Sequence, residues 1–150
     1  MQIRAVSEIY AFEHALPLIV ANGLDISALG QLDGMFAAIV NGALVGFAGF
    51  TLCSSSGIAY LRALCVKDTY RLQDYARRLV QRVVQSIDAS LYKVRLLPAA
   101  AMKSFYERLG FCEIAAAEAK AADTYAGRAD WRDHIAMELI TTEARSSSKI

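Results

Sequence analysis

The sequence has few of the residues that build metal centres and disulfide bonds. It contains three cysteines and two histidines in 150 residues, and no two cysteines have the CxxC spacing. The cysteines are Cys53, Cys65 and Cys112, and the histidines are His14 and His134, each without a second ligand at a useful spacing. An odd number of thiols in apolar surroundings is typical of proteins in the reducing cytoplasm. We therefore expect a cytoplasmic protein without a metal site or a disulfide bond.

Charge of one sign and long apolar runs are also lacking. Sixteen Lys and Arg residues stand against fifteen Asp and Glu residues, which leaves a net charge of +1. Nucleic acid and anionic membranes attract a basic excess, so neither is an expected partner. No apolar run approaches the roughly 20 residues that span a bilayer, and the N-terminal MQIRAVSEIYAFEH carries charge where a signal peptide has its apolar core. A small molecule or another protein is the expected partner.

The residues that are present favour one well-buried domain. Hydrophobic residues make up 55% of the chain, and no internal repeat or linker divides it. We expect a single domain over residues 1–140 and a polar tail over residues 141–150. Within the domain, the alanine-rich stretch of residues 115–133 is expected to be a long connection before the last strand.

Hydrophobic spacing and turn residues predict the order of strands and helices. Apolar runs bounded by turns predict strands at Ile3–Val6, Met35–Val40, Ala43–Cys53, Ile58–Val66, Leu91–Leu97, Phe111–Ala115 and His134–Ile140. Helical spacing predicts helices over Ile9–Val20, Arg71–Asp88 and Met102–Leu109. Ser7 is the expected cap of the first helix, Pro17 should kink it, and Gly110 should end the last one.

The turn signals between these elements indicate how the strands pair. Asn41-Gly42 predicts a tight hairpin, so the three strands between Met35 and Val66 should form an antiparallel meander. Residues 22–34 are expected to be loop and turn. The order of elements indicates an α+β or α/β fold, in which helices cover the faces of a sheet.

The stretch YRLQDYARRL, from Tyr70 to Leu79, is the main functional signal. It follows a predicted strand and opens a predicted helix, an arrangement that directs unpaired backbone N–H groups and the helix dipole at an anion. Loops that approach a phosphate closely usually contain glycine, and this loop contains none. The stretch is therefore a working phosphate site, a damaged one, or only a turn.

The stretch LCVKDTYRLQDYARRLV has a pattern that narrows these alternatives. It resembles the acyl-CoA segment of the GCN5-related N-acetyltransferase (GNAT) superfamily, in which a strand ending in Val precedes Arg/Gln-x-x-Gly-x-Gly/Ala at the start of a helix. Arg71, Asp74 and Ala76 occupy these slots. The stretch MKSFYERLGF is similar to a later helix of the same family. It supplies the family's Tyr-x-x-x-Gly-Phe, whereas Ala99 stands where Asn is usual.

The resemblance extends over nearly the whole predicted domain and implies its fold. That fold is GNAT, a mixed central sheet of about six or seven strands flanked by about four helices. The resemblance also implies acetyl-CoA as co-substrate, bound between the strands at Ile58–Val66 and Leu91–Leu97. Dimers are frequent in the family, so a homodimer is one assembly that it allows.

The resemblance further implies which residues hold acetyl-CoA. The backbone amides expected at the pyrophosphate are those of Arg71, Leu72, Gln73, Asp74, Tyr75 and Ala76. Cys65 and Val66 are expected to hydrogen-bond the pantetheine arm, and Arg77 adjoins the phosphates as a further cofactor-binding residue.

Asp74 departs from the family pattern because it replaces a glycine. It adds a β-carbon and a negative charge where a phosphate must approach. At about 5 Å and an effective dielectric constant of about 20, the repulsion is about 3 kcal/mol unless the side chain turns away or the neighbouring arginines offset it. In the alternative interpretation, Asp74 caps the helix and the loop binds no ligand.

Two side chains outside the loop are candidates for chemistry. In the family, a tyrosine at the place of Tyr106 lies near the thioester sulfur and protonates the thiolate; the alternative is an aromatic core residue like Phe105. Arg62 is the only charge in its strand, and the resemblance implies that it binds a substrate carboxylate, with a structural salt bridge as the alternative. No Asp or Glu occurs between Asp33 and Asp68, so no general base is assigned.

The resemblance as a whole implies an N-acetyltransferase. A weaker likeness of AYLRALCV and RLLPAAAMKSFYERLGF to domains that acetylate glutamate and phosphinothricin-like compounds implies a small, amino-acid-like acceptor, whose primary amine attacks directly. The alternative from another class is a non-catalytic GNAT-fold binding or regulatory protein with an acyl-CoA loop that Asp74 has made degenerate.

Overall fold

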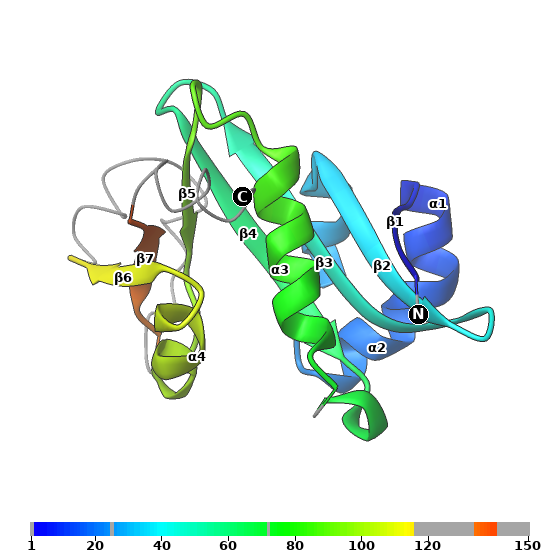
Figure 1. Ribbon diagram of the computed structural model, residues 1–150. Helices are drawn as coiled ribbons and strands as arrows, with labels where there is room; N and C mark the ends of the chain where they lie inside the picture. The colour runs from blue at the N-terminus through cyan, green and yellow to red at the C-terminus, as the bar shows by residue number, and fades with distance from the viewer. Residues whose placement is uncertain (1, 25, 72, 116–133, 141–150) are drawn as a thin grey trace. The chain divides into compact units, whose positions relative to one another are not determined.

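The computed structural model describes residues 2–24, 26–71, 73–115 and 134–140. Its strands form a seven-stranded sheet in the order β1-β2-β3-β4-β5-β7-β6, which confirms the predicted mixed α+β fold (Figure 1). The strands are β1 (Gln2–Ala5), β2 (Gly34–Val40), β3 (Ala43–Cys53), β4 (Ile58–Val66), β5 (Lys93–Leu96), β6 (Phe111–Ile114) and β7 (Ala136–Leu139). The predicted tail, Leu72 and almost all of the alanine-rich connection lie outside the described residues.

The helices are short apart from one. They are α1 (Glu8–Tyr10), the π-helix η1 (Ala11–Ala15), α2 (Leu16–Ala21), α3 (Tyr75–Ser86) and α4 (Lys103–Glu107), with 3-10 helices η2 (Ile26–Gln31), η3 (Asp68–Tyr70) and η4 (Ala100–Met102). None of the helices among the described residues has the length and apolar character needed to cross a membrane.

Contacts divide the chain into two compact units. Unit 1 comprises residues 1–52 and 61–87, and unit 2 comprises residues 53–60 and 88–150. Strand β4 contributes to both, because its first residues, Ile58–Tyr60, belong to unit 2 and the rest to unit 1. Each unit is described below by itself.

The first helical segment of unit 1 begins as predicted and is interrupted near the predicted place. Ser7 Oγ accepts a hydrogen bond from the backbone N–H of Tyr10 at 3.1 Å, which confirms the cap. The predicted kink takes the form of the π-helical turn η1, which ends just before Pro17, a residue without an N–H to donate. The predicted loop at residues 22–34 differs from expectation because it contains the 3-10 helix η2.

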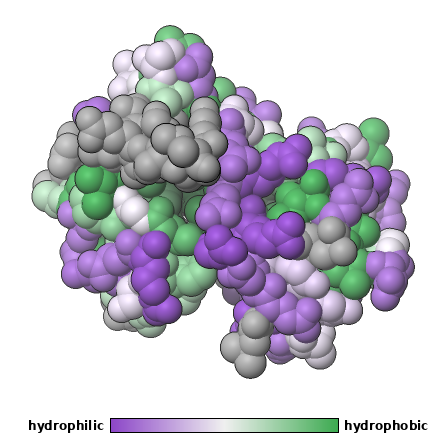
Figure 2. Space-filling model, viewed as in Figure 1, coloured by the Kyte–Doolittle hydropathy of each residue, from purple (hydrophilic) through white to green (hydrophobic). Residues whose placement is uncertain are grey.

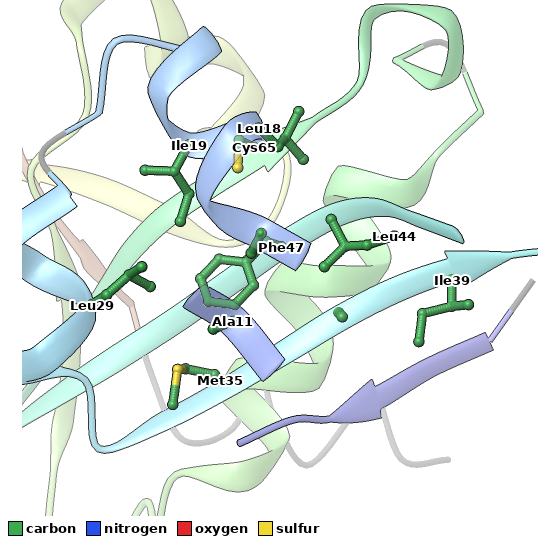
Figure 3. Packing of buried hydrophobic residues seen from close by; sticks show 11 residues of the cluster. Ala11, Leu18, Ile19, Leu29, Met35, Ile39, Leu44, Phe47 and Cys65 are labelled. Atoms are coloured by element: carbon green, nitrogen blue, oxygen red, sulfur yellow. The ribbon is translucent and has the colours of Figure 1, made fainter. Parts of the chain in front are cut away.

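Unit 1 has three layers, with helices on both faces of its strands. Asn41 and Gly42 have φ angles of 51° and 79°, the left-handed pair that a tight hairpin requires, and β2 and β3 pair antiparallel around them. The helical segment before β2 buries Ala11, Leu18 and Ile19 against one face (Figure 3). Helix α3 covers the other face with Leu79, Val80 and Val83.

Most predicted elements differ from the structure by one or two residues at an end, and three of the differences have a local cause. Helix α3 begins at Tyr75 rather than at Arg71, because η3 and a left-handed residue at Asp74 come first. Helix α4 is shorter than the prediction because η4 includes Met102 and because residues 108–110 form a turn after Glu107. Strand β5 starts two residues later than expected, because residues 89–91 form a turn after Asp88.

Among its described residues, unit 2 has short strands and one α-helix, α4. Ile58–Tyr60 of β4 pairs parallel with Lys93–Arg95, whereas β7 pairs antiparallel with both β5 and β6. Helix α4 packs against β6 through Tyr106, whose ring lies 5.9 Å from that of Phe111. Gly110, which joins the two elements, has a φ of +97°, as predicted for a residue that ends a helix.

We expect Gly110→Ala to lower the free energy of unfolding by about 1 to 2 kcal/mol, because an L-residue is strained at a left-handed φ. The measurement is urea unfolding followed by circular dichroism. Gly30→Ala is the matched control, since a Cβ there meets nothing closer than Glu8 Oε1 at 3.8 Å and the φ is ordinary. Equal stability of the two variants would contradict the strain at Gly110.

Candidate functional site

The candidate site runs from the end of β4 to the first turn of α3, all within unit 1. Successive turns organise it, since the backbone N–H of Arg71 donates to Asp68 O at 3.3 Å and that of Gln73 to Tyr70 O at 3.2 Å. The Tyr75 hydroxyl donates to Gln73 Oε1 at 3.3 Å, and the Tyr70 and Tyr75 rings lie 5.8 Å apart. Hydrogen bonds and ring contacts therefore hold a loop that has no glycine.

Asp74 has a left-handed backbone, with φ 68° and ψ 9°. This conformation is the physical reason why a glycine is usual in its slot, since most side chains are strained there. Aspartate and asparagine tolerate it best among the other residues. Asp74 therefore preserves the backbone path that the missing glycine would take.

The Asp74 carboxylate is turned towards Arg77. Arg77 Nε donates to Oδ1 at 2.7 Å, and Nη2 forms a second contact with Oδ2. The hydrogen bond from Arg77 is the main reason why the pKa of Asp74 is lowered. Asp74 is the N-cap residue of α3, as the capping alternative expects, but its side chain makes no hydrogen bond to the amides of the first turn.

The start of α3 leaves backbone donors available. The first helical bond is donated by Arg78 to Asp74 O at 3.2 Å. Within the described residues, the N–H groups of Asp74, Tyr75, Ala76 and Arg77 have no acceptor. Unpaired amides at the start of a helix of 12 residues form a site for an anion.

The outward face of α3 adds positive charge beside these amides. Figure 2 shows a hydrophilic band over this helix, and the exposed residues are Arg77, Arg78, Gln81, Arg82, Gln85 and Ser86. The Arg82 guanidinium lies over the Phe36 ring, 5.3 Å from its centre, whereas Arg77 and Arg78 belong to the first turn. The local field at the first turn therefore favours an anionic ligand.

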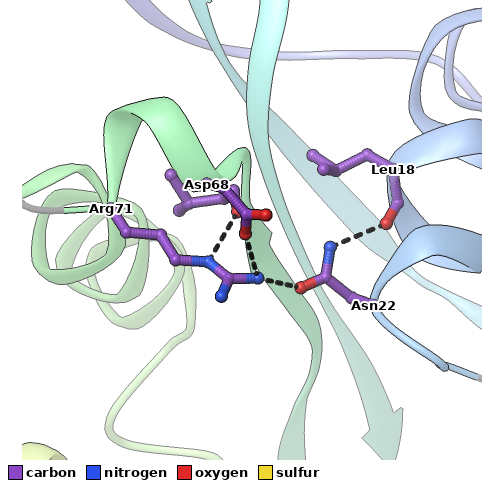
Figure 4. A network of polar contacts seen from close by, with 5 residues as sticks. Leu18, Asn22, Asp68 and Arg71 are labelled. Atoms are coloured by element: carbon purple, nitrogen blue, oxygen red, sulfur yellow. Dashed lines mark hydrogen bonds and ion pairs between the residues drawn. The ribbon is translucent and has the colours of Figure 1, made fainter.

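Arg71 ties the loop to other parts of unit 1 (Figure 4). Its Nε donates to Val66 O at 3.2 Å, and its Nη2 donates to Asn22 Oδ1 at 2.7 Å and lies 3.0 Å from Asp68 Oδ1. Arg71 and Asn22 also line a pocket of about 650 Å³, together with Lys67. The Arg71 side chain is thus a structural clamp as well as a charge beside the loop.

Cys65 and Val66 contribute backbone rather than reactive side chains. The Cys65 side chain belongs to the hydrophobic core of unit 1, close to Leu18 and Phe47 (Figure 3). Burial raises the pKa of its thiol to about 12, so Cys65 is not a nucleophile at physiological pH. The Val66 carbonyl already accepts from Arg71.

Arg62 lies in β4 beside an unusual residue. Its Nη1 donates to Gln31 Oε1 at 3.2 Å and to Thr51 Oγ1 at 3.3 Å, and both acceptors are neutral. The next residue, Ala63, has a left-handed φ of 60° inside the strand, and Arg62 to Leu64 are half-buried although the residues on either side of them are buried. Strained backbone of this kind often marks a functional site, and the sequence contains no signal of it, since alanine does not favour this conformation.

Tyr106 lies in unit 2, on α4. It is 5% exposed, and its ring meets Phe105 and Phe111 edge to face. Burial raises the pKa of its hydroxyl well above the usual value, so the group keeps its proton at physiological pH. The described residues offer this hydroxyl no hydrogen-bond acceptor, which leaves its proton available for donation.

Unit 2 also contains a buried polar network that the sequence analysis did not identify. Arg95 is 4% exposed, and its Nε donates to Glu138 Oε1 at 2.8 Å. Tyr60 lies beside Arg95 in the register of β4 and β5, and its side chain interacts electrostatically with the guanidinium. A buried guanidinium requires such partners, so the network explains why these polar groups occur in a core.

Comparison with protein families gives one match to the sequence. Residues 31–113 match the family described as Acetyltransferase (GNAT) domain. These residues include β2 to β5, the candidate loop and the helix that carries Tyr106. No curated protein matches the sequence.

Solved structures with the same fold include several acetyltransferases. An acetyltransferase from Streptococcus agalactiae has a TM-score of 0.73 at 20% identity, over 93% of this chain and 98% of that one. N-acetylglutamate synthase from Neisseria gonorrhoeae, complexed with coenzyme A and N-acetyl-glutamate, has a TM-score of 0.74 at 16% identity, over 93% and 35%. Rv2747 from Mycobacterium tuberculosis, in complex with CoA and NLQ, has a TM-score of 0.69 at 14% identity, over 94% and 99%.

Two substitutions of Asp74 separate its backbone role from its charge. Both Asp74→Gly and Asp74→Ala remove the ion pair with Arg77, but only glycine adopts the left-handed φ without strain. We expect Asp74→Ala to be less stable than Asp74→Gly by about 1 to 2 kcal/mol in urea unfolding at pH 7. If the two variants unfold at the same urea concentration, the left-handed backbone at this position is refuted.

Proposed function

Because the chain belongs to the GNAT acetyltransferase family, we propose that it transfers an acetyl group to the primary amine of a small, amino-acid-like molecule. It is a GNAT-type N-acetyltransferase, and acetyl-CoA is its co-substrate. The observation that carries the proposal is the start of α3. The amides from Asp74 to Arg77 have no acceptor among the described residues, which suits them to bind an anion, and the Asp74 carboxylate is held by Arg77.

The loop fits a pyrophosphate although it lacks the usual glycine. The repulsion of about 3 kcal/mol applies to an unpaired carboxylate, whereas the pair of Asp74 and Arg77 has no net charge. The N–H groups of Arg71 and Gln73 already donate within the loop, so we assign the pyrophosphate chiefly to the amides of Asp74 to Arg77. This arrangement argues against the alternative of a degenerate, non-catalytic loop.

Acetyl-CoA supplies an activated acetyl thioester, and the residues of this chain determine how it is used. The backbone of Cys65 and Val66 is proposed to hold the pantetheine arm. The Cys65 thiol stays protonated and buried, which disfavours a covalent acyl-enzyme and favours direct attack by the amine. Backbone N–H groups of β4 are proposed to stabilise the oxyanion.

Tyr106 is proposed as the general acid. The hydroxyl of this buried tyrosine holds a proton at physiological pH and can give it to the departing thiolate as the bond between carbon and sulfur breaks. The new bond between carbon and nitrogen forms from a neutral amine, which then releases its extra proton to water. Tyr106 recovers its proton from water, so the protons balance over one turnover.

Arg62 is proposed to bind the carboxylate of the acceptor. Gln31 and Thr51 hold the guanidinium in position through hydrogen bonds, and the planar, permanently charged guanidinium group is suited to binding a carboxylate. The residue beside it, Ala63, has the left-handed backbone that interrupts β4. In the same proposal, residues 1–140 act as one acyltransferase domain and the protein acts in the cytoplasm.

An assay with paired acceptors tests the proposal. The pair is an amino acid and its carboxamide, which differ in the charge that Arg62 is proposed to recognise. We expect Arg62→Gln to lower kcat/KM for the amino acid by about 10-fold to 100-fold and to leave kcat/KM for the carboxamide unchanged. Acetyl-CoA binding, measured by calorimetry, should stay the same.

Arg82→Gln is the matched control for this assay, because it makes the same chemical change on the outer face of α3. It should leave both acceptors unaffected. Equal losses for the amino acid and the carboxamide would refute the role of Arg62. Failure of the wild-type protein to bind acetyl-CoA at millimolar concentration would refute the enzymatic function itself.

Tyr106→Phe tests the general acid. We expect kcat to fall by about a hundredfold, with little change in KM for either substrate, because only the donated proton is lost. Tyr10→Phe in unit 1 removes a hydroxyl far along the chain from α4 and should leave kcat unchanged. The measurement is steady-state kinetics on both variants. An unchanged kcat in Tyr106→Phe would show that Tyr106 is an ordinary aromatic core residue and not the general acid.

A further inference from the structure

Asn22 joins the end of helix α2 to the candidate loop. It is the C-cap residue of α2, directly after Ala21, and its Nδ2 donates to Leu18 O at 2.8 Å. Its Oδ1 accepts from Arg71 Nη2 at 2.7 Å, across 49 positions of sequence (Figure 4). A carboxamide has one donor end and one acceptor end, and both ends are used here. The bond to Leu18 therefore orients the oxygen towards Arg71.

The guanidinium that Asn22 holds is also bonded to the loop itself. Arg71 Nε donates to Val66 O, the last residue of β4, and Nη2 lies near Asp68. The Asp68 side chain is 85% exposed, and exposed ion pairs contribute little stability. Asn22 is thus the better anchor of the Arg71 side chain, because a second hydrogen bond fixes its own position.

One side of the Arg71 guanidinium remains available. Among the described residues, Nη1 has no acceptor, whereas Nε and Nη2 are both engaged. A guanidinium held on two nitrogens and open at the third can meet an anion without a large loss of side-chain entropy. The unpaired amides of Asp74 to Arg77 follow a few residues later in the same loop.

We propose that Asn22 is a positioning residue for the acyl-CoA loop. It makes no contact with acetyl-CoA, but it holds Arg71, and through Arg71 it holds the Val66 carbonyl and the path of the chain towards Asp74. The inference rests on the proposed function, since it adds a residue from α2 to the site where acetyl-CoA binds. It makes the affinity for acetyl-CoA depend on the end of a helix that is distant in sequence.

Asn22→Ala and Ser7→Ala form a matched pair of variants. Each removes a side-chain hydrogen bond from one end of the same helical segment, but Ser7 bonds only the backbone of Tyr10 and does not contact Arg71. We expect Asn22→Ala to weaken acetyl-CoA binding about tenfold by calorimetry, and to raise KM for acetyl-CoA more than it lowers kcat. Ser7→Ala should leave the dissociation constant unchanged.

Hydrogen exchange of the free protein gives a second measurement that needs no cofactor. In Asn22→Ala we expect the backbone amides of residues 66–73 to exchange about tenfold faster, whereas in Ser7→Ala they should exchange as in the wild type. If acetyl-CoA does not bind the wild-type protein, the proposed function fails, while the exchange rates still decide whether Asn22 orders the loop.

A double-mutant cycle with Arg71→Ala completes the test. If Asn22 acts through Arg71, removing Asn22 from a protein that already lacks the Arg71 side chain should change acetyl-CoA affinity less than twofold. Additive losses in the two single variants would overturn the inference. The inference would also be overturned if Asn22→Ala had the same exchange rates and the same acetyl-CoA affinity as Ser7→Ala.

Discussion

The left-handed backbone at Asp74 is the constraint on which the candidate site depends. It turns the chain from the end of β4 and η3 into the axis of α3, so that several N–H groups are left unpaired at the same place. Any residue in this position must tolerate a positive φ, and a charged residue must also be neutralised beside a phosphate. Arg77, one helical turn later, neutralises it. A backbone requirement and an electrostatic requirement are thus met by two neighbouring side chains.

The rest of the loop is held by contacts that reach outside it. Arg71 connects the last residue of β4 with the C-cap residue of α2, and Tyr75 is a buried residue at the start of α3. These contacts replace the rigidity that a compact, glycine-rich turn would have. In unit 2, Tyr106 is enclosed by aromatic rings, and its burial keeps the hydroxyl protonated. The anion-binding role proposed for the loop and the proton-donating role proposed for Tyr106 therefore both come from local environments rather than from unusual residue types.

Much of the fold could be predicted because its signals are local. Asn41-Gly42 specifies a hairpin through its own φ angles, Ser7 caps the helix that follows it, and Gly110 ends α4. The start of α3 was harder to predict, because helical spacing continues through Arg71 and Asp74 although the backbone is not helical there. Ala63 could not be predicted at all, since nothing in the chemistry of alanine favours a left-handed residue inside a strand.

The amino-acid sequence was enough to predict the order of the elements, the hydrophobic faces and the positions of the acyl-CoA pattern, because each depends on spacing along the chain. The direction of the Asp74 carboxylate, the contact of Asn22 with Arg71 and the network of Tyr60, Arg95 and Glu138 required coordinates. The direction of the Asp74 carboxylate depends on the rotamer of that side chain. The contact of Asn22 with Arg71 and the network around Arg95 join residues that are far apart in sequence. Such contacts exist only after packing has placed the elements, so no short-range pattern encodes them.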